Sequence, residues 1–104
     1  MEGLIMNIKI NSLRFSPTTE LENFVQGKIK KLGHFYDEII EAEVFLKLEK
    51  TQNPENKVAE IRLEIPGNEL FAKKQSKSFE ESTDNAIEAI KKQITRYKTK
   101  KKRA

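Results

Sequence analysis

Few residues in this sequence could carry out acid–base or nucleophilic chemistry, and their spacing matches no catalytic motif. His34 is the only histidine and cysteine is absent, so a thiol nucleophile and a cluster of histidine or thiolate metal ligands are both excluded. The acidic pairs Asp37/Glu38 and Glu80/Glu81 fit a loop border and the first turn of a helix, where carboxylates are favourable. We therefore expect a protein that is not an enzyme and that uses no metal, cofactor or small-molecule substrate, with His34 exposed at a helix end.

Basic side chains are a stronger signal, because they are concentrated at one end of the chain. The net charge of the 104 residues is only +4, but residues 1–90 carry twelve basic and sixteen acidic side chains. Residues 91–104 carry eight basic side chains and no acidic one. A basic segment attached to a slightly acidic body indicates a polyanionic partner, either nucleic-acid phosphates or an acidic membrane surface.

The spacing of these cations suits the surface of a helix. At about 100° per residue, Lys92, Arg96 and Lys100 follow one flank, while Lys91 and Lys98 follow the opposite flank. A run of lysines on a helix is often only a solvated face, and that interpretation remains open. A solubilising helix, however, usually places Glu four residues from Lys, and this segment contains no acid. The composition therefore favours a nucleic-acid surface.

Alternating hydrophobic residues predict four strands, each with one apolar face. The expected strands span residues 4–11, 42–49, 57–65 and 69–74. Short polar turns separate the last three, which favours antiparallel hairpins. Phe45 and Phe71 fall on the solvent-side phase of their strands, where they are either ordinary exposed aromatics or a second contact surface.

Helical periodicity predicts two helices. The first begins at Ser16-Pro17, with Ser16 as the N-cap, and ends at Gly33. The second begins with a capping box, in which Ser78 covers the Glu81 N–H and Glu81 bonds back to Ser78. Residues 101–104 contain no large apolar side chain and are expected to fray into a basic tail.

The order β-α-β-β-β-α, with one apolar face per element, predicts a single α+β domain over residues 1–100. Its economical form is a two-layer sandwich, with a four-stranded sheet and both helices on one face. If the helices pack side by side, Lys28 and Lys31 of the first can converge with the cations of the second on the groove between them. Such a strip suits the phosphates of an RNA backbone. Lys73, Lys74 and Lys77 either extend it or protect an edge strand from aggregation.

Several segments form a recognisable pattern through their order and spacing. They are Leu21-x-x-Phe-Val25, Lys28-x-x-Lys-Leu32, Val44-Phe-Leu-Lys-Leu-Glu-Lys50, Ser78-Phe79 to Asp84, and Ile87-x-x-Ile90-x-Lys92-Gln93-Ile94-x-Arg96-x-Lys98-x-Lys100. With these segments the chain resembles the short form of the ribosome hibernation promoting factor family, which includes the ribosome-associated translation inhibitor. The resemblance extends from Met6 to about Lys100.

The resemblance implies a fold similar to double-stranded RNA-binding domains with an added first strand. It also implies a cytoplasmic stress-response factor that binds 16S rRNA in the A/P-site channel of the small ribosomal subunit. Translation in stationary phase or starvation would then be inhibited by exclusion of tRNA and mRNA. The basic positions that the resemblance assigns to the rRNA backbone are Lys28, Lys31, Lys92, Arg96, Lys98 and Lys100. Ala89 stands where some relatives carry a basic residue, so that contact is either missing or replaced by Lys91.

Two other hypotheses remain open at this point. One is a general double-stranded RNA-binding module without a ribosomal role. The other is a protein-interaction domain that uses the exposed sheet face around Phe45 and Phe71. The sequence has no signal peptide and no apolar run long enough to span a bilayer, so we expect no membrane partner. We also expect the free protein to be monomeric.

Overall fold

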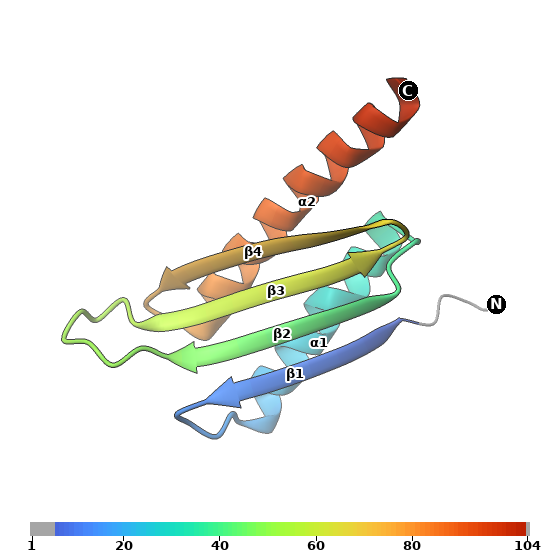
Figure 1. Cartoon of the computed structure of the whole chain (residues 1–104). Coiled ribbons are helices and arrows are strands. Elements are labelled where there is room, and N and C mark those ends of the chain that lie inside the picture. Colours follow the sequence, from blue (N-terminus) through green and yellow to red (C-terminus); the bar gives the residue numbers. More distant parts are fainter. Residues whose placement is uncertain (1–5, 104) are drawn as a thin grey trace.

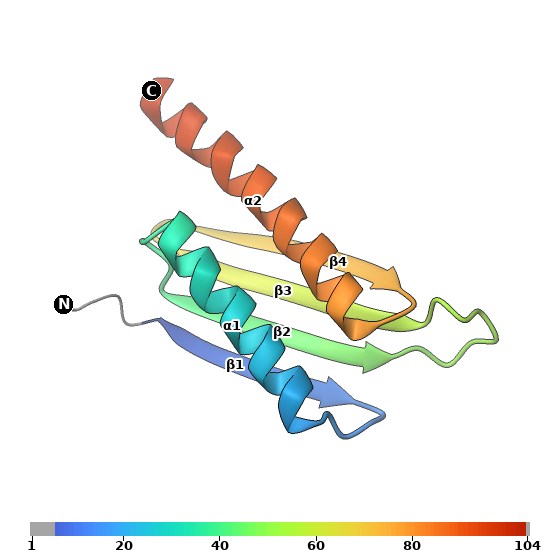
Figure 2. The ribbon, with the colours of Figure 1, turned by 180° about the vertical axis from the view of Figure 1, so that it is seen from behind.

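The protein folds into two layers, a four-stranded sheet and two helices that cover one of its faces. Figure 1 shows the uncovered side of the sheet and Figure 2 the helical side. This computed structural model describes residues 6–103, and the side chains of residues 6–99. The elements are β1 (Asn7–Leu13), α1 (Thr19–Phe35), β2 (Glu41–Leu48), β3 (Lys57–Ile65), β4 (Asn68–Ser76) and α2 (Phe79–Arg103). The predicted α+β sandwich is confirmed.

The strands lie in the order β1-β2-β3-β4, with β1 parallel to β2 and the other two neighbouring pairs antiparallel. Their register places Ile10, Val44, Ile61 and Ala72 in one row across the sheet. Because successive side chains point to opposite faces, a shift of one residue would move this row from the helices to solvent. Residues 4 and 5 of the first predicted strand lie outside the described residues.

Aliphatic side chains fill the space between the sheet and the helices. Those larger than alanine and with no exposed surface are Val25, Ile29 and Leu32 of α1, Ile90 and Ile94 of α2, and Val44, Leu46, Ile61 and Leu63 of the sheet. Each such side chain contributes about 1.5–3 kcal/mol through burial. The apolar stripes predicted for both helices therefore form the core.

The ends of α1 differ from the prediction. Thr18, not Ser16, is the N-cap, and its Oγ1 accepts a hydrogen bond from the Leu21 N–H at 3.1 Å. At the other end the helix continues past Gly33 to Phe35. Gly33 is buried, and a Cβ there would lie 3.1 Å from the side chain of Met6. The glycine thus lies inside the helix, against the tip of the Met6 side chain just before β1, and does not terminate the helix.

The beginning of α2 agrees with the prediction in part. The Glu81 N–H donates to Ser78 Oγ at 3.0 Å, as expected of a capping box. The Ser78 N–H, however, donates to Ser76 Oγ at 3.3 Å, so the predicted reciprocal bond to Glu81 is replaced. Ser76 Oγ lies 2.8 Å from Ser82 Oγ, which joins the end of β4 to the first turn of α2.

The far end of α2 extends beyond the sheet (Figure 1). Among the side chains of residues 6–99, Tyr97 is the last on α2 with a hydrogen bond to the sheet layer, where its hydroxyl donates to the carbonyl of Pro66, in the turn after β3, at 3.2 Å. The helix then continues to Arg103, which differs from the fraying predicted after Lys100. Lysine and arginine are good helix formers, so a lysine-rich segment can extend a helix without core contacts. The division into a domain of residues 1–100 and a basic tail of residues 101–104 stays a prediction.

A candidate nucleic-acid interface on the helical face

The predicted basic residues lie on the helical face, which we define as the solvent side of α1 and α2. Phe24, Lys28, Lys31 and Phe35 recur along α1 at spacings of four, three and four residues, so they share the side of that helix that approaches α2. The ammonium groups of Lys91 and Lys98 contact the ring of Phe35, so α2 lies beside this side of α1.

The side chain of Lys28 lies at the interface between the two helices. Its Nζ lies 3.0 Å from Asp84 Oδ1 of α2 and 5.3 Å from the centre of the Phe24 ring. Its charge is therefore partly satisfied inside the protein. Lys31 lies one turn further along α1, is exposed, and has no carboxylate within ion-pair distance among the described side chains.

Lys91 and Lys98 of α2 both approach the ring of Phe35, the last residue of α1. Their ammonium groups lie 5.5 and 5.8 Å from the ring centre. Lys91 also pairs with Glu88 at 3.7 Å, but both side chains are substantially exposed, and such pairs contribute little stability. Lys98 contacts Tyr36 as well, at 5.9 Å.

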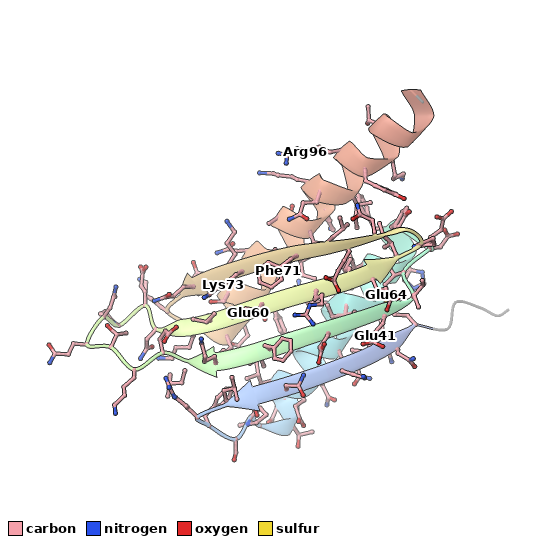
Figure 3. All side chains as sticks on the ribbon, viewed as in Figure 1. Glu41, Glu60, Glu64, Phe71, Lys73 and Arg96 are labelled. Carbon is pink, nitrogen blue, oxygen red and sulfur yellow. The ribbon has the colours of Figure 1, made fainter. Side chains whose placement is uncertain are left out.

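Lys92 and Arg96 occupy the outer flank of α2. Two shallow clefts meet at them. One, of about 420 Å³, lies between α2 and the edge strand β4 and is lined by Lys74, Asn85, Glu88, Ala89, Lys92, Gln93 and Arg96. The other, of about 340 Å³, is lined by Phe35, Glu88, Lys91, Lys92, Thr95 and Arg96. Figure 3 shows Arg96 pointing away from the sheet, into solvent.

The predicted residues are thus brought together in two connected groups. Lys28, Lys31, Lys91 and Lys98 line the junction of α1 and α2, while Lys92 and Arg96 lie on the outer flank. The cleft beside Phe35 joins the groups, because Lys91, Lys92 and Arg96 all line it. The side chain of Lys100 lies outside the described residues.

One contributor to this surface was left open by the sequence prediction, and Phe35 with its buried neighbour Tyr36 was missed. Lys74 had two open interpretations, and it lines the same cleft as Lys92 and Arg96. Phe35 and Tyr36 were not considered, although the helical spacing of Phe24, Lys28, Lys31 and Phe35 was visible in the sequence. Burial and a 3.2 Å hydrogen bond to Glu38 raise the pKa of the Tyr36 hydroxyl to about 12.

The opposite, sheet face differs in its electrostatics. Its cations have carboxylate partners: Lys9 with Glu41 at 3.6 Å, Lys47 with Glu49 at 3.5 Å, Arg62 with Glu43 at 3.5 Å and with Glu69 at 3.8 Å, and Lys73 with Glu60 at 3.8 Å. Figure 3 shows Glu60 and Lys73 on neighbouring strands of this face, with Phe71 beside them. Phe45 is partly buried under Arg62, and Phe71 is 47% exposed.

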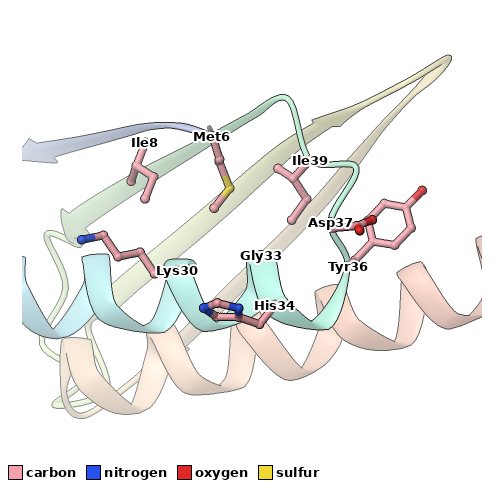
Figure 4. Close-up of a pocket in the computed structure, with 8 residues that line it drawn as sticks. All are labelled: Met6, Ile8, Lys30, Gly33, His34, Tyr36, Asp37 and Ile39. Carbon is pink, nitrogen blue, oxygen red and sulfur yellow. The ribbon is translucent and has the colours of Figure 1, made fainter. Parts of the chain in front are cut away.

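A separate pocket of about 280 Å³ lies where β1 meets the end of α1 (Figure 4). Met6, Ile8 and Ile39 give it an apolar floor, and the exposed side chains of Lys30 and His34 lie at its margin. In the described part of the chain, no three His, Cys, Asp or Glu side chains are grouped closely enough to hold a metal ion. No described helix has the length and apolar character needed to cross a membrane.

Known proteins with similar sequences and folds point to one family. The chain is 28% identical over 97 residues to the ribosome hibernation promoting factor of Klebsiella oxytoca, covering 93% of this chain and 98% of that one. The factor of the same name from Pseudomonas putida is 25% identical over 95 residues, covering 91% and 89%. The resemblance predicted from the sequence is confirmed.

Solved structures support the fold. A ribosomal subunit interface protein from Coxiella burnetii superposes with a TM-score of 0.80 at 18% identity, over 90% of this chain and 99% of that one. The N-terminal domain of Thermus thermophilus Protein Y superposes with a TM-score of 0.73 at 24% identity, over 88% and 99%. The sequence pattern of the Sigma 54 modulation protein / S30EA ribosomal protein family matches residues 8–102, and the chain belongs to that family.

Proposed function

We propose that this protein is a cytoplasmic ribosome hibernation factor that binds the small ribosomal subunit through its helical face. The single observation that carries the proposal is the set of exposed cations on that face, Lys31, Lys92, Arg96 and Lys98, which have no carboxylate partner among the described side chains. Relatives named ribosome hibernation promoting factor support the choice of the ribosome as the polyanion.

The proposed mechanism is steric. The domain occupies the A/P-site channel, where its cations bind 16S rRNA phosphates and its body excludes tRNA and mRNA. The residues assigned to this contact are Lys28, Lys31, Lys91, Lys92, Arg96, Lys98 and Lys100. Affinity comes mainly from counterion release, because folded RNA is recognised largely through its backbone and shape.

The ion pairs of Lys28 and Lys91 do not remove these residues from the proposed surface. Both pairs are partly exposed, with 34% and 38% of the two lysine side chains accessible, so an rRNA phosphate can compete with the carboxylate. The contribution of these two residues is nevertheless expected to be smaller than that of Lys92 and Arg96.

The test is binding to purified small ribosomal subunits at increasing salt. With about six phosphate contacts, raising salt from about 50 to 200 mM weakens binding roughly a thousandfold. Replacing Lys92 and Arg96 by alanine removes two contacts, lowers affinity on the order of 50-fold at about 100 mM salt, and reduces the salt slope by about two.

The matched control is Lys9→Ala with Lys73→Ala, which removes the same charge from the sheet face. This variant should bind within about twofold of the wild type, since exposed paired charges contribute little. Equal losses in the two variants would mean that net charge, not the helical face, determines binding. A cell-free translation assay completes the test, because inhibition should fall with affinity.

A general double-stranded RNA-binding module remains the rival hypothesis. It predicts similar affinity for a free RNA duplex and for the small subunit, whereas our proposal requires strong preference for the subunit. Sedimentation of the free protein checks the accompanying expectation that it is monomeric away from the ribosome.

A further inference from the structure

Phe35 is an exposed aromatic side chain placed among cations. It is the last residue of α1, 41% of it is accessible, and it does not belong to the buried core or to the partly buried residues packed against the core. The next residue, Tyr36, is buried and anchors the chain at this point. Phe35 is therefore not required to terminate or anchor the helix.

The immediate surroundings of this ring are polar and positive. The ammonium groups of Lys91 and Lys98 both lie within 6 Å of the ring centre, at 5.5 and 5.8 Å. Lys92 and Arg96 line the cleft beside the ring, together with Thr95 and one acid, Glu88, which pairs with Lys91. Two ammonium groups thus lie over one partly accessible aromatic ring.

Two cations over one ring are attracted to the ring but repel each other, so a base that stacks there takes the place of an ammonium group. A flat group that stacks on the Phe35 ring and carries a negative charge on each side would interact favourably with the ring and with both lysines. A nucleotide in a single-stranded segment has this form, with a flat base between two phosphates. An A-form duplex does not, because its bases are stacked and paired inside the helix.

We propose that Phe35 is a stacking platform for one unpaired base of the bound RNA, with Lys91 and Lys98 holding the phosphates on either side. This inference rests on the proposed function and deepens it, since it names an unstacked nucleotide as the ligand at this point of the helical face. It also adds a contact that depends on a base and not only on phosphates.

A fluorescent variant tests the stacking directly. The chain contains no tryptophan, so Phe35→Trp introduces a single indole at the proposed platform. Adding a single-stranded RNA dodecamer at low salt, or purified small subunits, should quench its emission through base stacking. Phe71→Trp is the matched control, because Phe71 is similarly exposed, at 47%, but lies on the sheet face. Unchanged emission of the Phe35→Trp protein with saturating subunits would overturn the proposal.

Binding measurements separate stacking from charge. Phe35→Ala should weaken small-subunit binding roughly 5- to 150-fold, the range observed for loss of one base–aromatic stack. The salt slope should stay unchanged, because no charge is removed. Phe35→Leu keeps apolar bulk without the aromatic face and should lose most of the same affinity, whereas Phe71→Ala should bind like the wild type.

The outcomes distinguish failure of this inference from failure of the proposed function. If Phe35→Ala binds like Phe71→Ala while Lys92→Ala/Arg96→Ala is weakened, the platform is wrong and the ribosomal interface stands. If the wild-type protein does not bind the small subunit, the proposed function fails and the platform fails with it.

Discussion

Both faces of this domain carry basic side chains, but the two faces differ in whether those side chains form ion pairs. On the sheet face, Lys9, Arg62 and Lys73 are each within 4 Å of a carboxylate on a neighbouring strand. On the helical face, Lys92 and Arg96 have no such partner among the described side chains. The net charge of +4 conceals this contrast. Charges that are paired within the protein support folding. Charges that have no partner within the described part of the protein are available to bind a polyanion.

The origin of the contrast lies in the arrangement of each element. In the sheet, register places Glu60 opposite Lys73 and Glu43 opposite Arg62, and directly opposed charges of opposite sign stabilise each other. In α2 the corresponding partners would be acids three or four residues away. None follows Glu88, so the last turns of α2 cannot neutralise their own charge.

The largest effect on subunit binding is expected when acidic residues are introduced on the helical face, so that its cations form ion pairs like those of the sheet face. Thr95→Glu places an acid three or four residues from Lys91, Lys92 and Lys98, and Thr99→Glu places one three residues from Arg96, without removing any cation. Two phosphate contacts would be neutralised, so affinity for small subunits should fall by about 50-fold or more at about 100 mM salt. Filter binding or sedimentation measures the loss.

The control for this variant adds the same charge to the other side of the molecule. Asn7→Glu with Gln52→Glu changes two exposed positions on β1 and in the turn between β2 and β3. Its affinity should stay within about threefold of the wild type, because charges beyond a Debye length of about 10 Å are largely screened. A comparable loss in both variants would remove the distinction between the faces.

A smaller effect, of opposite sign, is expected from freeing a paired cation of the helical face. Asp84→Asn removes the carboxylate 3.0 Å from Lys28 Nζ and makes that lysine available to a phosphate. One added contact should strengthen subunit binding by up to about eightfold at about 100 mM salt. Glu41→Gln frees Lys9 on the sheet face in the same way and should change nothing. Weaker binding by Asp84→Asn would mean that the pair positions α1 against α2 for binding.

The sequence was sufficient to predict the layers of this fold but not its helix ends. The alternation of apolar and polar residues in the strands and the apolar stripe of α2 are local patterns. The residues of that stripe, Ile87, Ile90 and Ile94, are buried in the core as predicted. Gly33 followed the usual rule for a helix end, yet the helix continues to Phe35 and the glycine lies buried against the side chain of Met6, a residue 27 positions earlier. A contact between segments this far apart in the chain cannot be found from a local pattern.

For the candidate site, the sequence predicted cations that converge from two helices, but not the contacts that each of them makes inside the protein. Lys92 and Arg96 were found from a helical pattern within one segment. The partner of Lys28 is Asp84, and the partners of Phe35 are Lys91 and Lys98, all more than 50 residues away. Neither helix alone carries this information, because it depends on how the two helices pack.

The smallest effect is expected from breaking an ion pair network on the sheet face. Arg62 lies 3.5 Å from Glu43, 3.8 Å from Glu69 and 5.9 Å from the centre of the Phe45 ring. Because the arginine is 46% accessible, Arg62→Ala should lower the free energy of unfolding by only about 1 kcal/mol. Urea unfolding measures this loss, which should shrink at high salt as the charges are screened.

Subunit binding provides the complementary measurement for Arg62→Ala. Affinity should stay within about twofold of the wild type, because the lost charge was already paired within the sheet. Lys92→Ala/Arg96→Ala should show the reverse, with binding weakened and the urea midpoint unchanged. If Arg62→Ala weakened binding and left stability intact, the sheet face would be the binding surface, because an arginine that serves folding cannot be removed without a cost in stability.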